Sequence, residues 1–162
     1  MIMILKKAGL LVMVGLLGCA PNVSPGVFST SSQETFYAAL ARASGSVYLK
    51  GQDITSPSLV DALIAVSKRK VNVVVLLERT APTNPTSRVN SLAKGLHSPA
   101  NVVFVAMGSD KIAPFGLVNG QSFYGEGLLN ETGEVLVGPP GKNLSSEISE
   151  FTNLARRAYV GE

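Results

Sequence analysis

The chain has 162 residues, a formal net charge of +3, one cysteine, one histidine and no tryptophan. A single cysteine excludes a disulfide within the chain. The small charge and the aromatic content of 6% give no support to a nucleic-acid partner, which would favour a strongly basic surface and rings for base stacking.

The first eighteen residues have the organisation of a signal peptide. Lys6 and Lys7 precede the apolar run 8-AGLLVMVGLLG-18, which is too short to serve comfortably as a membrane span. The run closes on 16-LLGC-19, which resembles the lipobox of bacterial lipoproteins. This resemblance implies that Cys19 is lipidated and becomes the first residue of the mature chain, so that no thiol remains for a metal site. The alternative is a secretory signal or short anchor in which Cys19 is incidental.

The sequence predicts three segments: a signal peptide over 1–18, a lipidated tether over 19–32 and one domain over 33–162. The stretch 20-APNVSPGVFSTSS-32 is rich in Pro, Ser and Gly, as linkers are. The 14 basic residues include Lys6 and Lys7, so twelve remain against 11 acidic ones, and the mature chain would be close to neutral.

The first half of the domain alternates predicted helices and strands. Ser31 and Glu34 have capping-box spacing at the start of a helix over 31–45. Ser56 as N-cap and Pro57 at the first helical position begin a second helix. The expected order is a strand over 46–51, this helix over 56–71, and a strand over 72–78 whose unbroken apolar run is typical of burial on both faces.

The second half ends in a predicted hairpin and a helix. A loop over 79–87, a helix over 87–96 and a strand over 101–106 come first. Apolar runs at 112–118 and 121–128 are then joined by Asn119-Gly120, a strong hairpin signal. A strand over 134–138 and a helix over 143–160 complete the pattern. This order predicts an α/β fold with a single mixed, mainly parallel sheet flanked by helices.

Residues 54–79 resemble a segment of the phospholipase D-like superfamily. There 54-ITSPSLVDALIAVSKRKVNVVVLLER-79 follows the pattern (T/S)-x-P-x-(I/L)-x-x-A-L-x-x-A-x-x-(R/K)-G-V-x-V-x-V-L-x-D, except that Lys70 replaces the glycine and Glu78 the aspartate. The order of elements agrees over 33–160. The resemblance implies a half-size phospholipase D-like domain, in which the 112–128 hairpin should lie against the strand at 72–78 or 101–106. The matching positions are Ser56, Pro57, Leu59, Ala62, Leu63, Val71, Val73, Val75 and Leu76.

The enzymes of that superfamily carry an H-x-K-x4-D motif, whose histidine attacks phosphorus and whose lysine binds the phosphate without a metal. If Asn119-Gly120 occupies the family's Asp-Gly turn, the histidine position is Ile112 and the lysine position is Pro114. Ile112 has no nucleophile, and Pro114 has neither charge nor N–H donor. Asn119 lacks the negative charge expected to orient an imidazole. Glu126 stands where the family's Gly-Ser would follow, and its carboxylate would repel a phosphate.

The remaining candidate groups do not restore the motif. His97 has Pro99 where the motif would need lysine, and we expect it in a surface loop. Lys111 is expected to be a solvated flank of the hairpin. The sequence therefore predicts a pseudoenzyme, a binding or scaffolding module with no cofactor and no metal. One alternative is an active phosphodiesterase of phospholipase or nuclease type, in which His97 or Lys111 lines a cleft beside Asn119. Another is an unrelated α/β domain whose resemblance to the superfamily is accidental.

The expected location is the bacterial cell envelope, outside the cytoplasm and attached to a membrane through Cys19. A homodimer is a further expectation, because superfamily members with a single motif dimerise. The other expected partners are an envelope protein or a phosphate-containing ligand, and nucleic acid is not expected.

Overall fold

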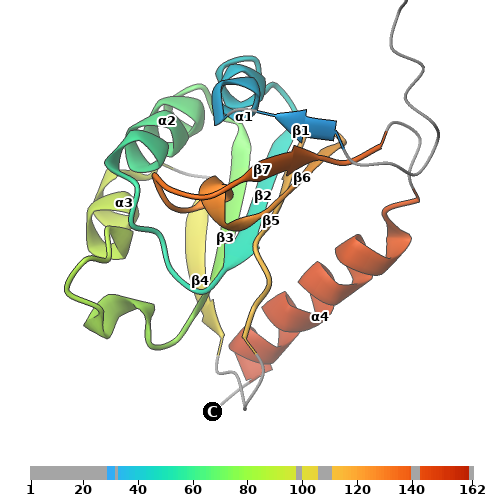
Figure 1. Ribbon diagram of the computed structural model, residues 1–162. Coiled ribbons are helices and arrows are strands. Elements are labelled where there is room, and N and C mark those ends of the chain that lie inside the picture. Colours follow the sequence, from blue (N-terminus) through green and yellow to red (C-terminus); the bar gives the residue numbers. More distant parts are fainter. Residues whose placement is uncertain (1–28, 32, 98–99, 106–110, 140–142, 161–162) are drawn as a thin grey trace, which may run out of the picture.

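The computed structural model describes residues 29–31, 33–97, 100–105, 111–139 and 143–160. Their strands form one seven-stranded sheet in the order β1-β7-β6-β5-β2-β3-β4 (Figure 1). The strands are β1 (Ser29–Ser31), β2 (Ser46–Gly51), β3 (Asn72–Glu78), β4 (Asn101–Val105), β5 (Phe115–Val118), β6 (Gln121–Tyr124) and β7 (Val135–Val137).

The α/β class and the mixed sheet are confirmed, but the expectation of a mainly parallel sheet is wrong. Strands β2, β3 and β4 run parallel. The other four pairings among the described strands are antiparallel. The hairpin causes this outcome, because β5 joins the parallel group antiparallel to β2 and the chain then returns through β6 and β7.

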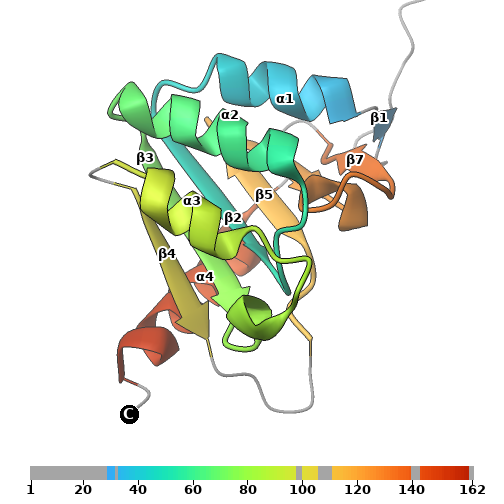
Figure 2. The ribbon, with the colours of Figure 1, turned by 90° about the vertical axis from the view of Figure 1, so that its left-hand side faces the viewer.

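Helices cover both faces of the sheet. Three of them, α1 (Gln33–Ala41), α2 (Pro57–Lys68) and α3 (Val89–Gly95), lie on one face, and α4 (Ser145–Val160) lies on the other (Figures 1 and 2). The larger core fills the space between the first three helices and the sheet. A smaller apolar cluster of Leu76, Ile112, Phe151 and Leu154 lies under α4. Two short 3-10 helices, η1 (Ala81–Thr83) and η2 (Glu126–Leu128), interrupt the loops.

The segment over 54–79 folds as its sequence indicates. The Oγ of Ser56 accepts the backbone N–H of Leu59 at 3.1 Å, and Pro57 opens α2. After α2, Lys70 has φ of 62°, in the left-handed region that favours glycine. This is the position at which the sequence departs from the family's glycine, so the backbone conformation is present although the residue differs.

Three further expectations differ from the structure. Ser29–Ser31 were expected in the tether, yet they form β1, which pairs with Val135–Val137 of β7. Because Ser31 belongs to this strand and α1 begins at Gln33, the predicted capping box at Ser31 is wrong. The hairpin also lies against β2, with Lys50 opposite Phe115, and not against β3 or β4 as expected.

The signal peptide over 1–18, Cys19 and most of the tether lie outside the described residues. Within the described ranges, no helix combines the length and the apolar character needed to cross a bilayer.

Candidate functional site

The parallel strands end at one edge of the sheet, and a small cavity opens there. It has a volume of about 190 Å³ and lies where β2 ends and the chain approaches β5. In open α/β sheets, ligands characteristically bind beyond the carboxyl ends of the strands. We call this space the acidic cavity; its lining residues are Gln52, Asp53, Thr55, Asn84, Pro114, Glu126, Leu129 and Asn130.

Asp53 organises one wall of the acidic cavity. Its Oδ1 accepts the backbone N–H of Ile54 at 2.7 Å and the hydroxyl of Ser87 at 2.6 Å. Its Oδ2 accepts the side-chain amide of Asn84 at 2.7 Å. The bonds from Ser87 and Asn84 fasten the loop after β3 to the end of β2, so the Asp53 carboxylate already has structural partners.

The opposite wall is held by Asn130. Its Oδ1 accepts the hydroxyl of Thr55 at 2.7 Å, and its backbone carbonyl accepts the side-chain amide of Gln33 at 2.8 Å. The same Gln33 amide also donates to the carbonyl of Gly127. The start of α1 is therefore tied to the segment that follows β6, and the cavity walls are fixed by hydrogen bonds.

The charge of the acidic cavity is unfavourable for a phosphate. The charged side chains that line it are the carboxylates of Asp53 and Glu126. Its volume also lies below the roughly 300–1,000 Å³ of usual small-molecule sites. In the described part of the chain, no group of three or more His, Cys, Asp or Glu side chains is placed to hold a metal ion.

The structure separates the three positions aligned with the catalytic motif. The Ile112 side chain is 2% exposed and lies in the apolar cluster under α4. The Ile112 backbone N–H donates to Oε1 of Glu78 at 3.0 Å, so the residue that replaces the family's aspartate holds this segment in place. Of the three positions, Pro114 alone lines the acidic cavity.

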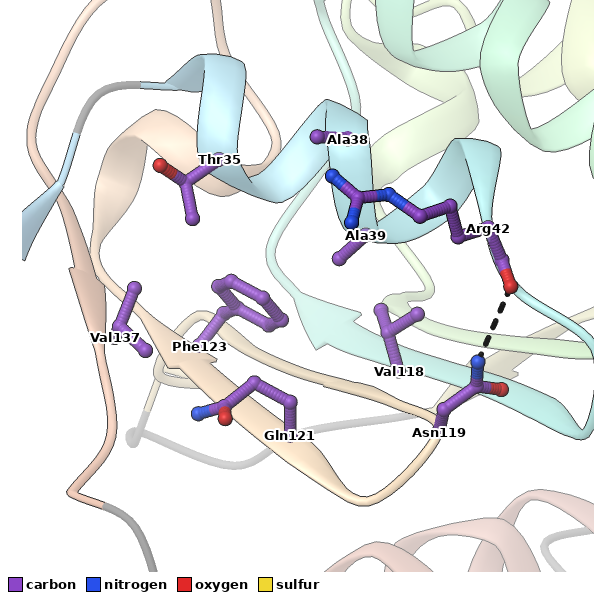
Figure 3. Close-up of a pocket in the computed structure, with 9 residues that line it drawn as sticks. All are labelled: Thr35, Ala38, Ala39, Arg42, Val118, Asn119, Gln121, Phe123 and Val137. Atoms are coloured by element: carbon purple, nitrogen blue, oxygen red, sulfur yellow. Dashed lines mark hydrogen bonds between the residues drawn. The ribbon is translucent and has the colours of Figure 1, made fainter.

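Asn119 lies at the other end of β5 and has a structural task. It occupies the hairpin turn with φ of 48°. Its Oδ1 accepts the backbone N–H groups of Ser44 and Gly45 at 3.2 and 3.0 Å, and its Nδ2 donates to the carbonyl of Arg42 at 3.4 Å (Figure 3). At about 3.4 Å per residue, the strand places it roughly 17 Å from Pro114. Orienting a group at the histidine position, the role of the family's aspartate, does not fit this geometry. Asn119 instead fastens the hairpin to the end of α1.

His97 and Lys111 are not brought to the acidic cavity. The backbone N–H of His97 donates to the Oγ of Ser67 at 3.3 Å, at the end of α2. His97 therefore precedes β4, whereas the acidic cavity lies beyond the carboxyl ends of β2 and β3, about 16 Å away along a strand of this length. Lys111 is exposed, and neither residue belongs to the cavity lining.

Asp53, Asn84 and Asn130 were not among the site residues predicted from the sequence. A usable signal was present, because Asp53 comes two residues after β2 and Asn84 lies in the loop after β3. Polar residues that follow parallel strands gather at one sheet edge. Asn130 gave no comparable signal, since it reaches the cavity from a segment far along the chain.

Comparison with known proteins supports the fold. No protein-family profile matches the sequence, and no curated protein matches it. Among solved structures, Nuc from Salmonella typhimurium, a phospholipase D family member, matches with a TM-score of 0.64 at 15% identity, over 81% of this chain and 95% of Nuc. NucT from Helicobacter pylori matches with a TM-score of 0.64 at 15% identity, over 81% of this chain and 98% of NucT.

The third similar structure is that of a chromatin protein. TrmBL2, an archaeal chromatin protein whose structure shows a novel mode of DNA binding, matches with a TM-score of 0.55 at 13% identity, over 83% of this chain and 54% of TrmBL2. The chain therefore has a phospholipase D-like α/β fold over most of its length. At these identities the likeness concerns the fold alone.

Proposed function

We propose that this protein is a lipid-anchored component of the bacterial cell envelope whose phospholipase D-like domain has lost catalysis and acts as a binding or scaffolding module. One observation carries the loss of catalysis: Ile112 is buried under α4, and Pro114 lines a cavity whose charged lining groups are carboxylates. Covalent phosphodiester cleavage needs a nucleophile, a cation for the phosphate and a proton donor.

The acidic cavity supports this proposal through its charge. A phosphate entering it would meet the carboxylates of Asp53 and Glu126, and like charges repel. The hydrogen bonds of Asp53 connect the segment after β2 to the loop after β3. The bond between Thr55 and Asn130 connects it to the segment after β6. In this protein, the polar residues beyond the carboxyl ends of the parallel strands stabilise the loops by hydrogen bonds and do not carry out a reaction.

Hydrolysis of bis(p-nitrophenyl) phosphate tests the loss of catalysis. The purified full chain should release p-nitrophenol no faster than buffer does. A matched His97→Ala preparation should behave identically. Release above the buffer rate that disappears in His97→Ala, or in Lys111→Ala, would establish the alternative of an active phosphodiesterase.

Metabolic labelling with an alkyne-bearing fatty acid tests the anchor. The wild-type chain should be labelled and should sediment with the membrane fraction, whereas Cys19→Ser should be unlabelled and released. Ala20→Ser changes the neighbouring residue and should leave both properties unaltered. A wild-type chain without label, or a labelled Cys19→Ser chain, contradicts lipidation at Cys19.

The proposed partners are a second copy of the chain, an envelope protein or a phosphate-containing ligand. Light scattering of the purified full chain measures the first. Cross-linking in cells followed by purification on the chain tests the second. A strictly monomeric protein that captures no partner above a control lipoprotein would contradict a scaffolding role.

A further inference from the structure

A second and larger hollow lies between α1 and the β5–β6 hairpin, on the face of the sheet that carries α1. Its volume is about 460 Å³, within the roughly 300–1,000 Å³ of small-molecule sites. We call it the α1 groove and define it by six of its lining residues, Ala38, Ala39, Arg42, Gln121, Phe123 and Val137 (Figure 3). It shares no lining residue with the acidic cavity.

The groove exists because α1 turns small side chains toward this part of the sheet. Phe36 and Leu40 of the same helix are fully buried in the core. Ala38 and Ala39 stand over the sheet and leave space that larger residues would fill. Phe123, with 1% exposure, forms the floor, and the half-buried Val137 forms part of one side. The bottom of the groove is therefore apolar.

The one charged side chain among the groove's lining residues is Arg42. Figure 3 shows it lying back along α1 above Ala39, over the hollow. It is exposed, and within the described residues no carboxylate is paired with it. The nearby amides of Asn119 and Gln121 donate instead to backbone carbonyls. A cation thus stands at the rim of an apolar floor, in contrast to the carboxylates of the acidic cavity.

These features exclude two other classes of ligand. A nucleotide base would need an exposed ring for stacking, and the ring of Phe123 is almost completely covered. A peptide added as a strand would need a free strand edge, and both β5 and β6 are paired on both sides. What remains complementary to the groove is a small molecule with an anionic head and an apolar body.

We infer that the α1 groove binds an aliphatic anion, with a carboxylate or phosphate monoester head on Arg42 and an alkyl chain over the accessible side chains of Ala38, Ala39 and Val137. The inference deepens the proposed binding role and rests on it. It requires neither the lipid at Cys19 nor the loss of catalysis. An arginine guanidinium suits either head, because it donates two parallel hydrogen bonds to a planar or tetrahedral oxyanion.

Protein-observed NMR titration of the full chain carrying Cys19→Ser tests the inference, with butanoate, hexanoate and octanoate as probes. Shifts should concentrate at α1 and the β5–β6 hairpin, and the affinity should rise about fourfold for each added methylene. Octanol should bind roughly tenfold more weakly than octanoate, since it cannot form the charged pair. Octyl phosphate in parallel identifies which head binds more tightly.

Three variants distinguish the contribution of the Arg42 charge to ligand affinity from that of the apolar surface of the groove. Arg42→Gln should lower the octanoate affinity about tenfold and leave octanol almost unchanged. Ala38→Leu should block both probes, because Ala38 lines the groove without packing into the core. Arg156→Gln removes an exposed arginine from α4 on the opposite face and should change neither affinity.

The inference is overturned if octanoate shows no saturable binding, if affinity does not depend on chain length, or if Arg42→Gln and Arg156→Gln behave alike. Shifts confined to Thr55 and Asn130 would place the ligand in the acidic cavity, which rejects the α1 groove but keeps a binding role. The cross-linking experiment tests that role separately, so the two failures can be told apart.

Discussion

Lys50 offers the sharpest test of how the sheet and α4 are joined. It lies on β2 with 2% exposure, facing α4, although lysine is almost never fully buried without a partner. Its Nζ lies 2.5 Å from Oε1 of Glu150, whose side chain is 56% exposed. The same ammonium lies 5.8 Å from the centre of the Phe115 ring. One partner of this ion pair is thus inside the protein and the other is at its surface.

The two partners should respond unequally to substitution. Glu150→Gln leaves the buried ammonium of Lys50 without its carboxylate, and breaking a fully buried pair in this way costs about 3–5 kcal/mol. Because Glu150 is half exposed and water can reach the site, we expect a loss of about 2 kcal/mol in the free energy of unfolding. Lys50→Met removes the buried charge itself and keeps most of the side-chain volume, so it should change that free energy by less than about 1 kcal/mol.

Urea denaturation followed by far-UV circular dichroism measures both effects, with an unchanged dependence on urea as evidence that the same surface unfolds. Glu131→Gln, an exposed loop acid, is the matched control and should stay within about 0.5 kcal/mol of wild type. The double variant Lys50→Met/Glu150→Gln should be more stable than Glu150→Gln alone. A Lys50→Met loss that exceeds the Glu150→Gln loss, or strict additivity in the double variant, would refute the reasoning.

Four further substitutions, at three positions, test the packing around the acidic cavity and the α1 groove by the same urea measurement. Asn119→Ala should lower the free energy of unfolding by about 2 kcal/mol and Asn119→Gly by about 1, because both lose the bonds to α1 while glycine tolerates the φ of 48°; equal losses would contradict this division. Gly125→Ala should lower it by at least about 2 kcal/mol, since φ is 106° and a Cβ would overlap the carbonyl oxygen of Glu134; a neutral result would mean that this turn is built otherwise. Phe36→Ala should lower it by about 3–5 kcal/mol, because the ring is fully buried and packs at 5.2 Å from that of Phe123; a loss below about 1 kcal/mol would contradict that packing.

Local patterns predicted the elements well. The strands at 46–51 and 72–78 were predicted with the bounds that the structure gives them. Ser56 and Pro57 begin α2 through a cap whose chemistry is contained within four residues. Asn119-Gly120 forms the expected turn, because its positive φ values are a property of those two residues.

Long-range partners could not be predicted in the same way. β1 has three residues of ordinary linker composition and becomes a strand through pairing with β7, more than a hundred positions later. The burial of Lys50 depends on α4 reaching across the sheet, which no spacing within β2 reveals. The acidic cavity is likewise lined by Asp53 and Asn130, which are far apart in the sequence. The sequence shows that both are polar, but it does not show that they lie close together in the fold.

β1 would be the first described element to carry a force applied through the proposed anchor at Cys19. It is the first described element, it lies at the edge of the sheet, and its neighbour in the sheet is β7. A force on the N-terminus is therefore applied first to this three-residue ladder, while Phe36 and Leu40 hold α1 in the core. Peeling β1 away would free its three extended residues, about 10 Å of chain, to reorient, and would leave β6 paired with β7. A domain attached through Cys19, as proposed above, would in this way move relative to its attachment and return without disturbing the core.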